Sequence, residues 1–184
     1  AEVSLAEIGL FALDGLPYTW KVLWAPLMDR IRPPLGRRRG WMLVTQISLV
    51  ISIGALGYLD PLHQTALVAV LASVIAFLSA SQDVAIDAYR REILLDAELG
   101  LGNAIHVQAY RIASLVPGSL SLILADMLPW TAVFWVTAAF MAVGIVLSLS
   151  IREPEDLSPP AQGLRATLLT PFTEYFHRVG WRGG

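Results

Sequence analysis

Long apolar stretches alternate along this chain with short polar segments. Residues 41–59 and 127–151 contain no Asp, Glu, Lys or Arg, and three further windows are almost as apolar. A helix of about 20 apolar residues matches the ~30 Å hydrocarbon core of a bilayer. Because lipid offers the backbone no hydrogen-bond partners, such stretches span as helices. The pattern predicts an all-α, polytopic transmembrane bundle with five spans in residues 1–152, at about 4–28, 41–59, 65–88, 102–125 and 130–151.

The segment that follows, 153–184, has a different character. Thr170 suits a helix N-cap and Pro171 the first helical position. Phe172, Phe176 and Val179 then recur at helical spacing. We predict a cytoplasmic linker carrying a short amphipathic helix at about 170–179 on the membrane face. A partly ordered linker is the alternative.

Composition agrees with a membrane protein and excludes several functions. The mean hydropathy is +0.60 and charged residues make up 15% of the sequence, against ~25% in soluble domains. The absence of cysteine excludes disulfides, thiol catalysis and cysteine-bound metals. No metal-ligand spacing and no phosphate-binding glycine loop is present, so we expect no metal and no cofactor.

Basic residues gather in alternate loops. They are Arg30, Arg32, Arg37, Arg38 and Arg39 after the first span, Arg90 and Arg91 after the third, and Arg152 and Arg165 after the fifth. The loops 60–64 and 126–129 have none. Basic loops mark the cytoplasmic side of a membrane protein. This rule explains the basic residues, so we expect no nucleic-acid binding. Five spans then place the N-terminus outside, so we expect a fragment that lacks a preceding helix.

Two carboxylates in the third span are the leading candidates for chemistry. Ionisable residues inside a bilayer cost at least ~2.5 kcal/mol and usually face a partner or a water-filled cavity. Asp83 lies about one turn deeper than Asp87. Asp83 is predicted to bind a proton or contact substrate, with an ion pair to Arg111 or Arg90 as the structural alternative. For Asp87, nearer the boundary, structural or gating pairing is the favoured interpretation.

Arg111 lies about nine residues into the fourth span. Its guanidinium stays charged, so it needs a carboxylate, an anionic substrate or water. We hypothesise an Arg111–Asp83 pair that opens on protonation or substrate binding. His106 is closer to the boundary, where a packing or solvated role is favoured over a proton relay. In the first span, Asp14 and Lys21 lie two turns apart, too far for direct pairing.

One loop resembles a known signature. Asp29-Arg30, followed after an insertion by Gly36-Arg37-Arg38-Arg39, is similar to the loop between the second and third helices of the major facilitator superfamily. The resemblance implies an N-terminal half in which these spans are helices two to six of twelve. It also implies that Asp29, Arg30, Gly36, Arg37, Arg38 and Arg39 act at a cytoplasmic gate, and that the first helix and the C-terminal half are missing partners.

More specific strings resemble the AmpG-type muropeptide permeases. They are residues 21–30, 36–41 and 79–89, Tyr110-Arg111, and residues 124–126. The resemblance implies a multi-pass protein of the bacterial inner membrane. It would import anhydromuropeptides with protons for cell-wall recycling. The residues expected along the proton or substrate pathway are Asp83, Asp87, Arg111, Gln82 and Tyr110.

Three alternatives stay open at this point. A major facilitator transporter of another bulky anion, such as an acyl-CoA, has the same fold. An integral membrane enzyme would use Asp83 and Asp87 on a metal, although the next span has no carboxylate before Asp126. The third alternative is a truncated product without activity.

Overall fold

The structure, a computed structural model, describes residues 16–155, which form helices joined by short loops. In chain order its elements are α2 (Leu16–Trp20), the 3-10 segment η2 (Lys21–Leu23), α3 (Ala25–Arg30), α4 (Arg37–Leu56), α5 (Thr65–Ile93), α6 (Leu99–Ala113), the π-helical segment η3 (Val116–Leu120), α7 (Ser121–Ala125), α8 (Trp130–Ala139) and α9 (Met141–Ser150). The described residues include no strand. The prediction of an all-α bundle is confirmed.

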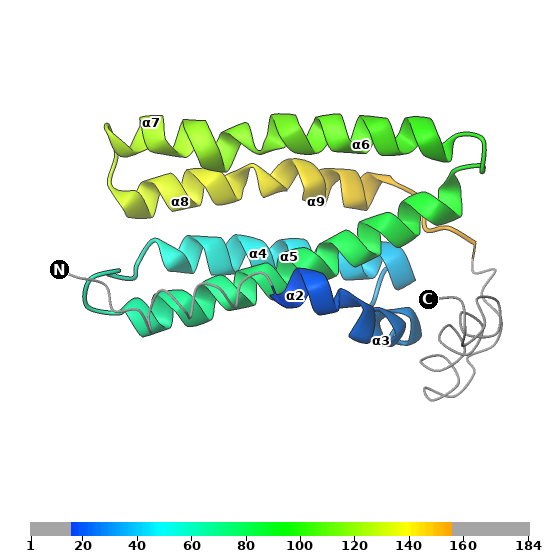
Figure 1. Cartoon of the computed structure of the whole chain (residues 1–184), viewed down its shortest axis with the longest axis horizontal. Helices are drawn as coiled ribbons and strands as arrows, with labels where there is room; N and C mark the ends of the chain where they lie inside the picture. The colour runs from blue at the N-terminus through cyan, green and yellow to red at the C-terminus, as the bar shows by residue number, and fades with distance from the viewer. Residues whose placement is uncertain (1–15, 156–184) are drawn as a thin grey trace, which may run out of the picture.

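Four helical runs in the described part are long and apolar enough to cross a membrane. They are Arg37–Leu56, Thr65–Ile93, Leu99–Ala125 and Trp130–Ser150. Figure 1 shows them side by side, with the loops after α4 and after α7 at one end of the bundle. The end of α3, the start of α4, and the ends of α5 and α9 meet at the opposite end. All basic loops of the described part therefore share one end.

Two predicted segments fall wholly or partly outside this description. Of the first predicted span, 4–28, the structure describes residues 16–28, where α2, η2 and α3 form a broken helix. The predicted amphipathic helix at about 170–179 lies outside the described residues.

The helices extend beyond the apolar segments from which they were predicted. Arg37, Arg38 and Arg39, placed in a loop by the sequence pattern, form the first turn of α4 instead. α5 continues to Ile93, and its 29 residues measure about 43 Å at 1.5 Å per residue. This exceeds the ~30 Å core. Hydropathy locates only the lipid-facing part of a helix, so charged ends were assigned to loops.

The helix α4 packs against α5, α8 and α9. Glycines permit the close approach: a Cβ at Gly54 would lie 2.7 Å from the Trp135 ring, and one at Gly144 would lie 3.0 Å from Gln46 Nε2. Thr131 Oγ1 also donates a hydrogen bond of 2.6 Å to the Gly57 carbonyl. Small residues are typical of tightly packed helices in lipid. This packing makes α4 the centre of the described bundle.

Pro117 and Gly118 lie in a π-helical segment, η3. Proline cannot donate the usual backbone hydrogen bond, and π segments accommodate such interruptions. Ser121 Oγ donates to the Val116 carbonyl at 3.0 Å and lies 2.7 Å from Thr137 Oγ1 of α8. The α7 half is thereby attached to α8, whereas no residue of α6 is buried.

Candidate functional site

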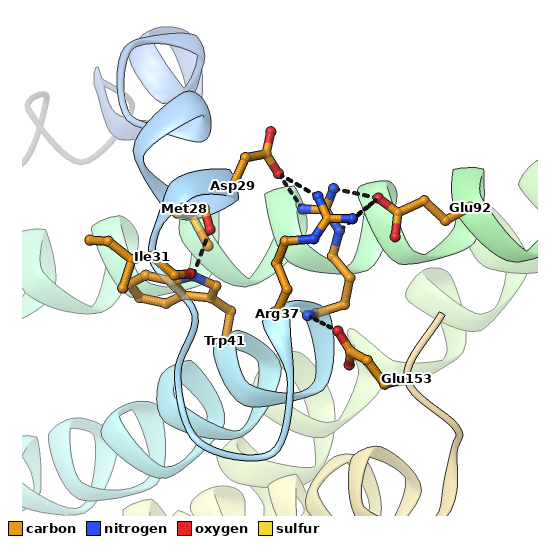
Figure 2. A network of polar contacts seen from close by, with 8 residues as sticks. Met28, Asp29, Ile31, Arg37, Trp41, Glu92 and Glu153 are labelled. Carbon is orange, nitrogen blue, oxygen red and sulfur yellow. Dashed lines mark hydrogen bonds and ion pairs between the residues drawn. The ribbon is translucent and has the colours of Figure 1, made fainter. Parts of the chain in front are cut away.

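Two groups of charged side chains stand out. The first, which we call the signature-loop network, comprises Asp29, Arg37, Arg38, Glu92 and Glu153 (Figure 2). The second, which we call the carboxylate cluster, comprises Lys21, Asp83, Asp87, Arg90 and His106. Both draw on α5: the network uses Glu92 near its C-terminal end, and the cluster uses Asp83, Asp87 and Arg90, up to about two and a half turns earlier.

The signature-loop network begins at the N-terminus of α4. The carboxylate of Glu153, which follows α9, accepts hydrogen bonds from the Arg38 and Arg39 backbone N–H groups at 2.7 and 2.9 Å. These N–H groups have no partner within the helix, and a negative charge is favourable at a helix N-terminus. Glu153 therefore caps α4 from a position more than a hundred residues away.

Gly36 makes this cap possible. It is the N-cap of α4, with a φ of +114°, a conformation that side chains with a Cβ rarely adopt. A Cβ at this position would lie 2.5 Å from the Glu153 carboxylate. The glycine of the signature is thus required both by the backbone turn and by the cap.

Arg37 and Arg38 are buried despite their charge, with 9% and 6% of their surface exposed. Glu92 Oε1 accepts from Arg37 Nη2 at 2.8 Å and from Arg38 Nη2 and Nε at 2.6 and 3.0 Å. Arg38 Nη1 also donates to Asp29 Oδ1. Buried charges need such partners, and these contacts join α3, α4 and α5.

Arg39 and Trp41 complete the connections at this end. The Arg39 guanidinium donates to the carbonyls of Ser148 and Leu149 at 3.1 and 2.8 Å. A cation at a helix C-terminus is favourable. Trp41 Nε1 donates to the Met28 and Ile31 carbonyls at 2.8 and 3.1 Å, as Figure 2 shows. The network thus joins the ends of four helical runs.

Substitution of Gly36 by alanine should lower stability. The backbone conformation alone costs a residue with a Cβ about 1–3 kcal/mol, and the new Cβ would displace Glu153 from the α4 N-terminus. We expect a lower melting temperature for the purified full-length protein. Gly100→Ala is the matched control, because a Cβ there meets nothing within 4 Å. Equal melting temperatures for the two variants would contradict this account of Gly36.

In the carboxylate cluster, Asp87 has two cationic neighbours. Arg90 Nη2 lies 2.9 Å from Asp87 Oδ1, and Lys21 Nζ lies 3.9 Å from Oδ2. The Asp87–Arg90 pair agrees with the structural role favoured by the sequence. The sequence pattern does not predict Lys21 as a site residue, because Asp14 lies two turns away, too far for direct pairing. Asp14 itself lies outside the described residues.

Asp83 differs from Asp87. Among residues 16–155, no hydrogen bond or ion pair reaches its half-buried carboxylate. Lys21, Asp87 and His106 are the groups close enough to act on it electrostatically. The adjacent Gln82 Oε1 is buried and, in the described part of the chain, accepts no hydrogen bond. A half-buried carboxylate with no partner among the described residues is a place where a proton can bind.

Contacts between the broken helix and α5 hold Lys21 in place. Tyr18 Oη donates to Ser79 Oγ at 2.8 Å, and Trp24 Nε1 donates to Ser81 Oγ at 3.1 Å. The Trp24 ring also packs on Phe77, with centroids 4.9 Å apart. These contacts lie on both sides of Lys21 in the sequence, so the backbone at Lys21 is positioned over the Asp83–Asp87 face.

Arg111 and Tyr110 lie away from this cluster. Both are exposed on α6, and Tyr110 has 70% of its surface accessible. Within the described residues, no side-chain hydrogen bond or ion pair joins Arg111 to Asp83. The Arg111–Asp83 pair is therefore absent from this structure, and its proposed opening and closing stays a prediction.

Two acidic residues of the signature-loop network were not predicted from the sequence. Glu92 follows two arginines at the end of α5, and Glu153 follows Arg152 just after α9. Their partners are 54 to 115 residues away. In the described part of the chain, no group of three or more His, Asp or Glu side chains is arranged to hold a metal ion.

Comparison with known families decides the broader identity. A family profile described as the Major Facilitator Superfamily matches residues 3–183. The chain belongs to the Major Facilitator Superfamily. Its all-α fold, with several apolar helices, is that of the N-terminal half of this superfamily. It is a multi-pass membrane protein, and the family does not favour the membrane-enzyme alternative.

Relatives within the superfamily are similar over nearly the whole chain. An uncharacterized protein of Haemophilus influenzae is 49% identical over 181 residues, which cover 97% of this chain and 43% of the relative. The anhydromuropeptide permease of Escherichia coli K12 is 45% identical over 178 residues, covering 96% of this chain and 36% of the relative. The chain thus spans about two fifths of the length of these relatives.

Proposed function

We propose that the complete protein is a proton-coupled importer of anhydromuropeptides in the bacterial inner membrane, serving cell-wall recycling. The observation that carries this proposal is the 45% identity, over 96% of the chain, to a protein named anhydromuropeptide permease. Membership of the Major Facilitator Superfamily supports a secondary transport mechanism. The proposal concerns the whole protein, of which this chain supplies the helices described above.

The carboxylate cluster is proposed as the proton-coupling part of the pathway. A carrier of protons needs a group that binds and releases one during each cycle, and Asp83 has no competing hydrogen bond in the described chain. The neighbouring residue in the sequence, Gln82, has a buried Oε1 that accepts no hydrogen bond in the described part of the chain. Arg111 and Tyr110 are proposed to face the substrate, whose peptide carboxylates suit a guanidinium.

The signature-loop network is proposed to act at the cytoplasmic gate. Transport in such folds rests on rocking two halves about a central site. The contacts from Asp29, Glu92 and Glu153 to the start of α4 hold the helix ends of this half together. If the N-terminal half moves as one rigid body, a change in protonation at the carboxylate cluster also moves the cytoplasmic gate.

The proposal is tested by uptake of labelled GlcNAc-anhydromuramyl peptide into spheroplasts that express the full-length protein. We expect uptake above that of an empty-vector strain. An excess of unlabelled anhydromuropeptide should abolish it, and an excess of acetyl-CoA should not. Uptake blocked by acetyl-CoA would favour the other bulky anions. No uptake by protein that is present and folded would overturn the substrate assignment.

A further inference from the structure

Lys21 is the only lysine in a sequence with 13 basic residues; the other twelve are arginines. The chemistry of the two side chains differs. Arginine is a planar fork that stays charged, whereas lysine carries a compact ammonium on a flexible four-carbon stem. The single lysine lies in the carboxylate cluster, where it neighbours two aspartates.

The contact between Lys21 and Asp87 is loose. Its N–O distance of 3.9 Å exceeds the ~2.7–3.2 Å of a hydrogen bond. Asp87 already holds a closer partner in Arg90, at 2.9 Å. Asp87 therefore has a neutralising cation even without Lys21. The carboxylate that has no hydrogen-bond or ion-pair partner among residues 16–155 is Asp83, about one turn away along α5 and within electrostatic reach of Lys21.

The backbone at Lys21 is also unusual. Lys21 begins η2, the 3-10 segment that separates α2 from α3, and Pro26 follows in the first turn of α3. A 3-10 stretch inside a helix often marks a functional hinge, and discontinuous helices accompany the binding sites of transporters. The lysine thus lies at an interruption of the helix that faces the aspartates.

We propose that Lys21 is a mobile counter-ion that moves from Asp87 to Asp83 each time Asp83 loses its proton. The inference rests on the proposed proton-coupled transport and deepens it. With a proton on Asp83, Lys21 remains near Asp87 beside Arg90. When the proton leaves Asp83 for the cytoplasm, the exposed negative charge attracts the ammonium. A proton arriving from the periplasm neutralises Asp83 and releases Lys21.

The other charged groups at the site fit this cycle. Arg90 stays with Asp87 when Lys21 departs, so Asp87 is never left without a partner. His106 of α6 also acts on Asp83, but α6 contributes no buried residue that would fix it there. Lys21 is therefore the cation positioned to compensate Asp83 during the return of the empty carrier.

The first test separates net transport from exchange in the full-length protein. Lys21→Met should lower gradient-driven accumulation of labelled anhydromuropeptide at least about fivefold, within the ~5–150-fold range typical of coupling between two sites. It should retain exchange of external label against internal unlabelled substrate, because exchange does not require Asp83 to lose its proton. Lys21→Arg should recover part of the accumulation, since the charge is kept.

Arg91→Met is the matched control, because the Arg91 side chain is 68% exposed and its ion pair with Asp96, at 3.6 Å, is its only one within the described residues. It should accumulate substrate as the wild type does. A merely structural Lys21 would reduce exchange and accumulation together. Accumulation by Lys21→Met equal to that of the wild type would overturn the inference.

A double variant keeps the test decisive if Lys21→Met fails to fold. Lys21→Met with Asp87→Asn removes one charge of each sign and leaves Asp83 without its cation. We expect this variant to exchange substrate and not to accumulate it. Restored accumulation would identify Lys21 as a fixed partner of Asp87 and overturn the inference alone. A wild-type protein without gradient-driven accumulation would instead overturn the proposed function.

Discussion

Replacement of Asp83 by asparagine is expected to abolish gradient-driven accumulation by the full-length protein while leaving it folded in the membrane. Asparagine has nearly the same shape and cannot exchange a proton. The Asp83 carboxylate has no hydrogen bond or ion pair among the described residues, so little structure depends on it. A carrier without coupling only equilibrates its substrate, so the inside-to-outside ratio should fall to about one.

The measurement is the steady-state ratio of labelled anhydromuropeptide in vesicles with an imposed proton gradient. Asp96→Asn is the matched control, since Asp96 is 93% exposed and lies outside the carboxylate cluster. It should accumulate substrate normally. If Asp83→Asn accumulates as much as the wild type, Asp83 is not the coupling residue.

Among substitutions in the signature-loop network, Glu92→Ala is expected to lower the stability of the folded protein the most. Glu92 is the shared acceptor of Arg37 and Arg38, whose side chains are 9% and 7% exposed. Removal of one partner leaves buried charges uncompensated, which costs about 3–5 kcal/mol. Asp29 contacts both arginines but is itself half-exposed, so it offsets only part of this cost.

Thermal unfolding of the purified full-length protein in detergent measures the effect. Glu155→Ala is the matched control, because Glu155 is exposed and lies two residues beyond Glu153. A melting temperature of Glu92→Ala equal to that of the wild type and of Glu155→Ala would contradict a stabilising role for the network.

The apolar pattern predicted the class of fold because lipid acts on each helix separately. A run such as Trp130–Ser150 must be helical whatever it contacts. Helix ends were predicted less well, because they depend on distant residues. The start of α4 at Arg37 requires the Glu153 carboxylate, and no local signal at residues 37–39 identifies that cap.

The candidate site was predicted only in part, because some of its features are local in the sequence and others depend on distant residues. An aspartate inside an apolar helix is recognisable by itself, so Asp83 and Asp87 were found in the sequence. The position of Lys21 beside them depends on the contacts of Tyr18 and Trp24 with α5, which join residues 57 to 61 positions apart. Sequence spacing within one helix carries no such information. The Arg111–Asp83 pair was predicted from the positions of the two residues within their spans, and it stays a prediction.

In the proposed mechanism, protons drive substrate import. Purified full-length protein in proteoliposomes tests it most directly, by comparing uptake of labelled anhydromuropeptide with an acidic outside medium and with equal pH on both sides. The account predicts accumulation above the external concentration only with the gradient, and its collapse on addition of a protonophore. Equal uptake with and without the gradient would contradict it.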